Sequence, residues 1–143
     1  MFLGEYTHSL DSKGRLTIPA RFRAQLEDGL VIARGQDACL IIYPRHEWDA
    51  LAEALGRLPR SSKGARSYTR LLFSGASEAT LDKMGRVLIP AFLREFVGIR
   101  EDAVLVGANS VIEIWNPEAW QQTLAENLAD IEEILGAVGQ MGV

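Results

Sequence analysis

Residue types that build common catalytic and metal sites are scarce in this 143-residue chain. It has one cysteine and two histidines, which excludes an internal disulfide and a cysteine-based metal site. Cys39 stands in the apolar run CLIIY, where we expect a buried thiol that packs as a small hydrophobic side chain. No apolar run approaches the roughly 20 residues that span a bilayer, and the amino terminus lacks the segments of a signal peptide. We therefore expect a cytoplasmic protein with no membrane partner.

The motifs of common enzymes are also missing. The sequence has no GxSxG elbow, no GxxxxGK[ST] phosphate loop and no metal-ligand spacing. The neighbouring residues Glu132 and Glu133 do not face one another on a helix, so a solvated acidic surface is favoured over a catalytic pair. We therefore predict that the protein is not an enzyme and uses no cofactor, metal ion or small-molecule substrate.

Basic residues are absent from the last part of the chain. Residues 1–100 contain 15 basic and 11 acidic side chains, whereas residues 101–143 contain no basic and 8 acidic ones. The net charge of -4 is therefore the sum of a basic part and an acidic part. Because charges are screened over about 8 Å at physiological salt, a basic patch can bind phosphate while an acidic segment lies elsewhere.

One stretch of the sequence occurs twice. LDSKGRLTIPAR, at residues 10–21, returns as LDKMGRVLIPAF at residues 81–92. With an offset of 71 residues, eight of fourteen positions are identical, and a looser likeness links LIIYPRHEW (40–48) to IEIWNPEAW (112–120). Two such units indicate an internal pseudo-dimer rather than a solenoid, which needs at least three repeats to bury its faces.

The repeat defines the predicted domain organisation. We expect a first repeat over residues 1–57, a basic linker over 58–70, a second repeat over 71–120 and an acidic C-terminal segment over 121–143. The linker is rich in Gly, Ser and Pro and contains several basic side chains. In the C-terminal segment, leucine and isoleucine recur at three- and four-residue spacing, which predicts an amphipathic helix before a loose tail.

Each repeated stretch is typical of a β-hairpin with a three-residue loop. Residues 12–14 and 83–85 fit a type I turn followed by a left-handed glycine. The aspartate before each loop can accept the loop N–H groups, and it lies opposite the arginine four residues later, which predicts an ion pair across the hairpin mouth. The motif residues are Asp11, Gly14 and Arg15 in the first copy and Asp82, Gly85 and Arg86 in the second.

The segments after each hairpin are also equivalent. An Ile-Pro-Ala sequence predicts a short helix over Pro19 to Leu26 and over Pro90 to Val97, because proline suits the first position of a helix. A second pair of apolar strands follows, LVIAR with CLIIY and AVLVG with VIEIW, and then a helix that starts at Pro44 or Pro117. The predicted order in each repeat is hairpin, short helix, hairpin and helix, which is an α+β fold.

The hairpins are candidate DNA-binding elements. A two-stranded ribbon can enter the major groove, and the forked donors of arginine match guanine O6 and N7. The alternative is a purely structural ion pair, since exposed pairs contribute only about 0–1 kcal/mol. Six residues are candidate DNA contacts: Lys13, Arg15, Arg21, Arg23, Lys83 and Arg86. Four residues are candidates for holding the motifs in shape: Asp11, Gly14, Asp82 and Gly85.

The doubled motif, LDSKGRLTIPARFR and LDKMGRVLIPAFLR behind an MFLGEY start, resembles the bacterial MraZ family over essentially the whole chain. The resemblance implies two tandem AbrB-like repeats that form an intramolecular swapped-hairpin β-barrel flanked by helices. It also implies a homo-oligomeric ring, such as an octamer, and a nucleoid-associated transcriptional regulator. Such a regulator represses the promoter of a cell-division and cell-wall gene cluster by binding G-rich direct repeats of double-stranded DNA. The family's DNA-contacting arginine falls on Arg15, with Arg86 at the second motif.

One departure distinguishes the two copies. Met84 stands in the second loop where the first loop has Lys13, so we expect the second copy to offer one phosphate-reaching charge fewer. We therefore expect the first hairpin to read DNA and the second to be partly structural. The alternative function is a protein-interaction module of antitoxin type that holds a partner through the acidic helix over residues 118–135.

Overall fold

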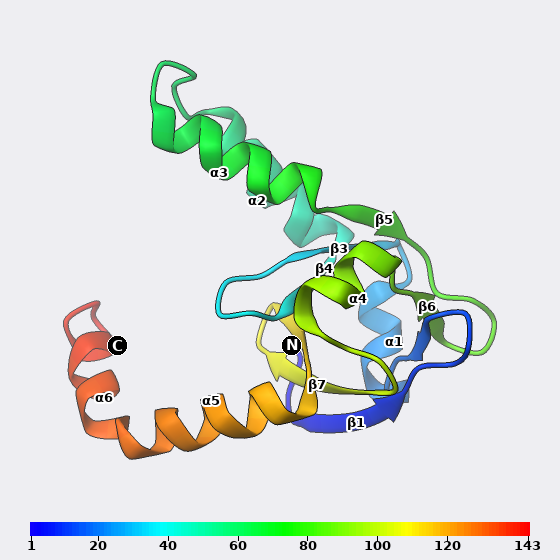
Figure 1. Cartoon of the computed structure of the whole chain (residues 1–143). Helices are drawn as coiled ribbons and strands as arrows, with labels where there is room; N and C mark the ends of the chain where they lie inside the picture. The colour runs from blue at the N-terminus through cyan, green and yellow to red at the C-terminus, as the bar shows by residue number, and fades with distance from the viewer.

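The two repeats share their strands in this computed structural model, which describes residues 1–143 (Figure 1). A six-stranded sheet has the order β1-β7-β8-β4-β3-β5, and β2 pairs with β6 in a separate two-stranded sheet. The strands of the first repeat are β1 (Glu5–Ser9), β2 (Arg15–Thr17), β3 (Leu30–Arg34) and β4 (Leu40–Pro44). Those of the second are β5 (Ser77–Ala79), β6 (Arg86–Leu88), β7 (Asp102–Ala108) and β8 (Val111–Trp115).

The two strands of the first hairpin pair with each other only next to its loop. A single bridge joins Leu10 to Leu16, and beyond it β1 pairs with β7 while β2 pairs with β6. In the same way β5 pairs with β3 of the first repeat. The strands on either side of each turn therefore bind the opposite repeat, which confirms the swapped arrangement.

The strands do not close into a barrel, contrary to the expectation. Strands β2 and β6 are three residues long, and each is followed two positions later by Pro19 or Pro90. Because proline has no N–H to donate, the ladder cannot continue through it. The result is two sheets rather than one closed surface.

A single hydrophobic core joins the two repeats. Its 18 buried side chains come from both of them, so neither repeat has a core of its own at this position. Equivalent residues meet there: Leu16, Ile18 and Phe22 from the first repeat, and Val87, Ile89 and Leu93 from the second. Smaller clusters lie under the helices on the outer side of the six-stranded sheet. One of them contains Cys39, which is buried as expected; burial raises the pKa of its thiol to about 12.

The short helices predicted after the hairpins are present. Helix α1 (Ala20–Arg23) continues as a 3-10 turn (Ala24–Leu26), and α4 (Ala91–Val97) ends at Gly98, whose φ is +68°. The longer helices α2 (Arg45–Gly56) and α5 (Pro117–Ala129) begin beside their prolines, as predicted. Each positions a tryptophan against the sheet: Trp48 contacts Tyr43, and Trp120 contacts Trp115.

The segment expected to be a basic linker is mostly helical. Helix α3 (Lys63–Ser74) occupies it, and the hydroxyl of Ser62 caps the helix by accepting the N–H of Ala65 at 3.2 Å. Leu72 is buried in a cluster with Trp48, which holds α3 beside α2. The two helices project from the sheet as a helical hairpin (Figure 1).

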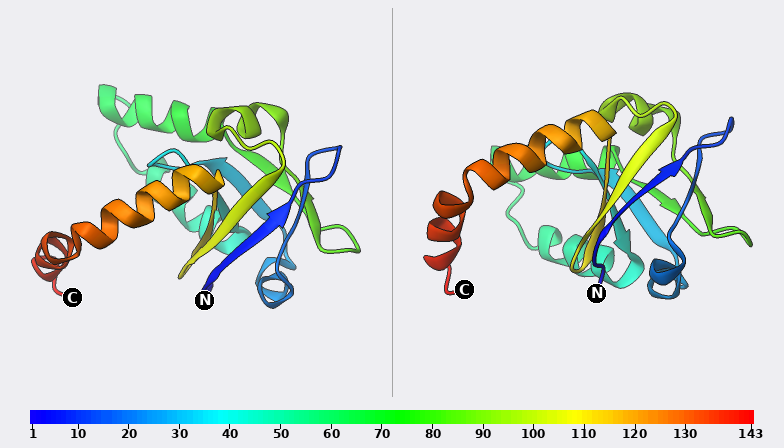
Figure 2. Two further views of the ribbon diagram at one scale, coloured as in Figure 1. Left: turned by 60° about the horizontal axis from the view of Figure 1, so that its bottom comes forward. Right: turned by 90° about the horizontal axis from the view of Figure 1, so that it is seen from below.

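The C-terminal segment contains two helices instead of the single one expected. Helix α5 ends at Ala129 and α6 (Ile131–Gly139) follows, because Asp130 leaves the helical conformation, with φ -102° and ψ 17°. Figure 2 shows α5 extending away from the sheets, with α6 turned at its end. None of the helices has the length and apolar character needed to cross a bilayer.

Candidate nucleic-acid interface

Each hairpin loop is held by its own aspartate, as predicted. In the first loop Asp11 Oδ1 accepts the backbone N–H of Lys13 at 3.0 Å and that of Arg15 at 2.9 Å. Gly14 donates its N–H to the Asp11 carbonyl at 3.0 Å and has a φ of +83°, which a residue with a Cβ adopts only with strain. The second loop repeats this geometry around Asp82, and Gly85 has a φ of +76°.

The same aspartates hold the motif arginines. Arg15 Nε donates to Asp11 Oδ2 at 2.6 Å, and Arg86 Nε donates to Asp82 Oδ2 at 2.8 Å. The pKa of each aspartate is lowered from 3.8, chiefly by the backbone N–H of the motif arginine and further by its guanidinium, against an opposing effect of partial burial. Both carboxylates therefore stay ionised at neutral pH and keep the loops and the arginines in place.

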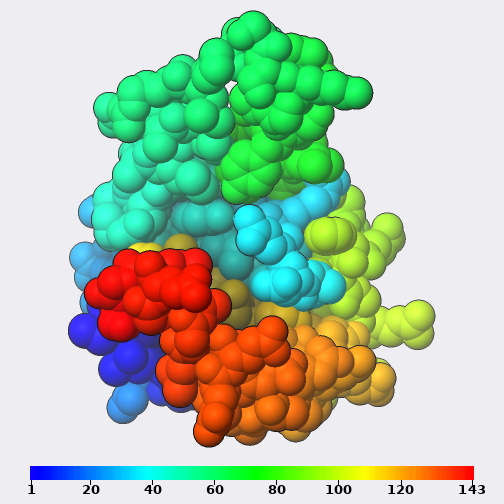
Figure 3. All heavy atoms as spheres, turned by 90° about the vertical axis from the view of Figure 1, so that its left-hand side faces the viewer, coloured from blue at the N-terminus to red at the C-terminus, as the bar shows by residue number.

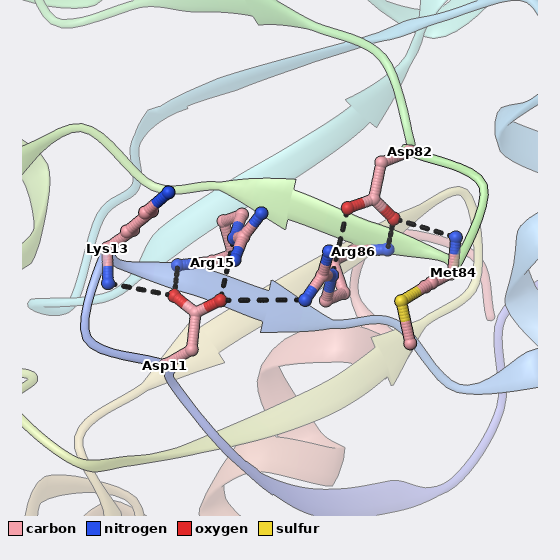
Figure 4. Close-up of polar contacts among 6 residues, drawn as sticks. All are labelled: Asp11, Lys13, Arg15, Asp82, Met84 and Arg86. Atoms are coloured by element: carbon pink, nitrogen blue, oxygen red, sulfur yellow. Dashed lines mark hydrogen bonds and ion pairs between the residues drawn. The ribbon is translucent and has the colours of Figure 1, made fainter.

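Swapping brings the two motifs together on one ribbon. Strands β2 and β6 run antiparallel, with Arg15 opposite Leu88 and Thr17 opposite Arg86. Arg15 and Arg86 are therefore diagonal neighbours on the same face of the ribbon (Figure 4). The opposite face of the ribbon packs into the core through Leu16 and Val87. Asp11 also contacts the second motif, since its Oδ2 lies 3.7 Å from Arg86 Nη1. The sequence, in which the motifs are 71 residues apart, does not indicate this proximity.

The guanidinium groups keep donors for a ligand. In Arg15 only Nε is bonded within the chain, so both terminal nitrogens are unused. In Arg86 one terminal nitrogen faces Asp11. The side chains of Arg15 and Arg86 are 32% and 24% exposed, and Asp11 and Asp82 restrict their orientation. A pre-oriented guanidinium whose two terminal nitrogens are both unused, as in Arg15, suits bidentate recognition of guanine or phosphate.

Arg23, a predicted DNA contact, instead packs against the opposite repeat. Its Nε donates to the Ile18 carbonyl at 2.8 Å, and its guanidinium occupies the place where a side chain at Gly85 would lie. Arg94 makes the equivalent contacts with Ile89 and Gly14. Each loop position therefore requires glycine for two reasons: the backbone has a positive φ, and an arginine of the other repeat occupies the space of a Cβ. Sequence reasoning did not identify this role, although Arg23 and Arg94 are identical positions in the repeat.

The three other predicted contacts are exposed around the ribbon. Lys13, Lys83 and Arg21 make no side-chain hydrogen bond or ion pair within the chain. With the repeat offset, Lys83 corresponds to Ser12, so each loop has one lysine at a different position. The expectation that the second loop has one charge fewer is therefore wrong.

The two repeats nevertheless present different surfaces near the ribbon. Four positions that are polar in the first repeat are apolar and exposed in the second. The polar residues are Lys13, Thr17, Arg21 and Gln25, and their counterparts are Met84, Leu88, Phe92 and Phe96, each at least 44% exposed. This difference favours the first repeat for contacts with a polyanion.

The fold and the ribbon define a class: an α+β protein of two interleaved repeats that presents paired Asp-x-x-x-Arg loops on one surface. Comparison with known proteins agrees with this organisation. The family model described as "MraZ protein, putative antitoxin-like" matches residues 1–71 and again residues 72–135. The chain belongs to the MraZ family.

Curated relatives are similar over most of their length. A protein named transcriptional regulator MraZ from Halothermothrix orenii is 45% identical over 143 residues, 100% of both chains. The protein of the same name from Roseiflexus sp. is 51% identical over 125 residues, 87% of both chains. The one from Clostridium tetani is 43% identical over 143 residues, again 100% of both chains.

Proposed function

We propose that this chain is a regulator of transcription that binds double-stranded DNA through the ribbon β2–β6. The observation that supports this proposal most is the convergence of Arg15 and Arg86 on one exposed face, each held by an ionised aspartate. A two-stranded ribbon fits the major groove, where arginine can bond two acceptors of one guanine. The names of the relatives agree with a role in transcription.

The ribbon residues have separate roles in this proposal. Arg15 reads guanine, because both of its terminal nitrogens are unused, and Arg86 has a weaker part, because one of its nitrogens faces Asp11. The exposed groups on the loops and on α1 contact phosphates; these are Lys13, Lys83 and Arg21. Arg23 positions the second loop and does not contact DNA.

The biological target follows from the family resemblance. The protein represses the promoter of a cell-division and cell-wall gene cluster by occupying G-rich direct repeats as a homo-oligomeric ring. One ribbon offers few base contacts, so several tethered ribbons on successive repeats raise the apparent affinity through effective concentration. Phosphate contacts release counterions, so binding weakens steeply as salt increases.

A mobility-shift titration with the DNA upstream of the chain's own gene tests the proposal. Arg15→Ala abolishes the shift at protein concentrations that saturate the wild type, while its mass in solution is unchanged. Arg45→Ala removes the same charge away from the ribbon, where the guanidinium is already paired with Glu78 at 3.0 Å, and it serves as the matched control. An Arg15→Ala protein that shifts the DNA as the wild type does would contradict the proposal.

A further inference from the structure

One apolar side chain stands on the polar face of the ribbon. In the ladder between β2 and β6, Leu88 lies directly opposite Arg15. Leu88 is 54% exposed, whereas its neighbour Val87 is 1% exposed and packs in the core. Because successive side chains of a strand point to opposite faces, Leu88 shares the outer face with the two motif arginines. This face of the ribbon therefore combines Arg15, Arg86, Thr17 and Leu88.

The fold does not require a leucine at this position. With the repeat offset of 71 residues, Leu88 corresponds to Thr17, which occupies the equivalent place in the same ladder and lies opposite Arg86. A polar side chain therefore satisfies the backbone there, and Leu88 belongs to none of the buried clusters. A single exposed leucine on an ordinary surface needs no explanation. This one is distinguished by its place beside the arginine that we assign to guanine.

The projecting helices lie away from this face. Helices α2, α3, α5 and α6 gather on the side of the molecule that Figure 3 shows. Strand β6 lies at the other side of the molecule in Figure 1. The side that contains the ribbon can therefore receive a long ligand such as a DNA duplex, and a ligand of Arg15 also meets Leu88.

Thymine offers the apolar group that fits Leu88. In the major groove guanine presents its O6 and N7 acceptors, and thymine presents its C5-methyl group. Side chains directly opposite one another in an antiparallel pair have Cβ atoms about 5 Å apart, and successive bases of one strand are separated by about 3.4 Å along the duplex axis. Arg15 and Leu88 are therefore spaced to contact neighbouring base pairs. Because leucine has no polar atom, the methyl group is its favourable partner at the edge of a base.

We propose that Leu88 is a specificity-determining residue that contacts the C5-methyl group of a thymine next to the guanine bound by Arg15. This inference rests on the proposed function and adds a second base to the readout. The reading unit is composite, since its arginine comes from the first repeat and its leucine from the second. The other half of the ribbon combines Arg86 with Thr17, so the two halves present different chemistry to DNA.

Deoxyuridine provides the test, because uracil pairs as thymine does and lacks only the methyl group. Mobility shifts give dissociation constants for the DNA upstream of the chain's own gene and for the same DNA with deoxyuridine in place of thymidine. Burial of one methyl group changes an equilibrium by about fourfold, so the wild type binds the uracil DNA about fourfold more weakly for each methyl contacted. Leu88→Ala, whose side chain is too short for the contact, loses this difference. Leu88→Met keeps an apolar side chain of similar volume and retains it.

The controls separate the contact from effects of folding and of DNA shape. Leu3→Ala truncates a leucine that is 61% exposed outside the ribbon, and it discriminates as the wild type does. An effect of deoxyuridine on duplex shape acts on every protein variant, so it cancels when the wild type is compared with Leu88→Ala. Equal affinity of the wild type for the two DNAs overturns the inference, as does discrimination that persists in Leu88→Ala. A Leu88→Ala protein that changes its mass in solution but not its discrimination assigns the side chain to a contact between proteins and overturns it as well.

These outcomes differ from a failure of DNA binding itself. If the wild type binds neither DNA, the proposed function and this inference are both wrong. If the wild type binds both DNAs equally while Arg15→Ala binds neither, the proposed function stands and only the contact of Leu88 is wrong.

Discussion

Alanine at Gly14 tests the packing between the repeats. A Cβ at this position would lie 2.8 Å from Cζ of Arg94, and the backbone φ is +83°. The left-handed conformation costs a residue other than glycine about 1–2 kcal/mol. Moving Arg94 also weakens its hydrogen bond to the Ile89 carbonyl, now 2.9 Å long, which adds about 1 kcal/mol. We therefore expect Gly14→Ala to lower the free energy of unfolding by about 2–3 kcal/mol.

Urea unfolding measures this loss. With a slope of about 2 kcal/mol/M, the midpoint falls by about 1–1.5 M. In an Arg94→Ala background the contact is absent, so Gly14→Ala costs only the conformational part, about 1–2 kcal/mol. Gly64→Ala on α3 is the control, because its Cβ would have only Ser62 Oγ within 4 Å, at 3.9 Å, and its stability does not fall. Equal losses from Gly14→Ala in both backgrounds would refute the reasoning.

Two further predictions concern the ribbon. Met84→Lys adds a cation at the position that Lys13 occupies in the first repeat, so it raises DNA affinity and steepens the salt dependence by about one phosphate contact. Met84→Gln, the control, does neither. An unchanged salt dependence in the lysine variant would argue against a DNA contact by this loop. Because the folded-state pKa values of Asp11 and Asp82 lie below 3.8, their stabilising effect is complete above that pH and is lost as the pH falls through the lowered values. The difference in urea midpoint between the wild type and the variant Asp11→Asn/Asp82→Asn is therefore constant from about pH 5 to 8 and shrinks at lower pH. A difference that shrinks as the pH rises would be inconsistent with this account.

The local chemistry of the loops could be predicted from the sequence. Asp11 and Gly14 have side-chain and backbone requirements that fit one turn, and the structure confirms the N–H contacts, the positive φ and the pairing with Arg15. The strand partners could not be predicted in the same way. Alternation of apolar residues indicates which face of β1 is buried, but not that β1 pairs with β7 rather than with β2.

Tertiary packing explains the other differences. Helix α3 forms in a segment whose Gly, Ser and Pro content is typical of a linker, because Leu72 is buried beside Trp48 and Ser62 caps the helix. The break at Asp130 leaves the leucine and isoleucine spacing intact, so periodicity alone predicted one helix. The inward position of Arg23 depends on the opposite repeat, which no local pattern contains.

The central claim is that the terminal nitrogens of Arg15 bond guanine. The most direct measurement compares dissociation constants for two DNAs: the DNA upstream of the chain's own gene, and the same DNA with 7-deazaguanine in place of guanine. The modified base lacks the N7 acceptor. Both the wild type and Arg15→Lys are measured with each DNA. The wild type is expected to bind the modified DNA about 5–150-fold more weakly, which corresponds to about 1–3 kcal/mol, and the lysine variant to discriminate far less. Equal affinity of the wild type for both DNAs would contradict the account.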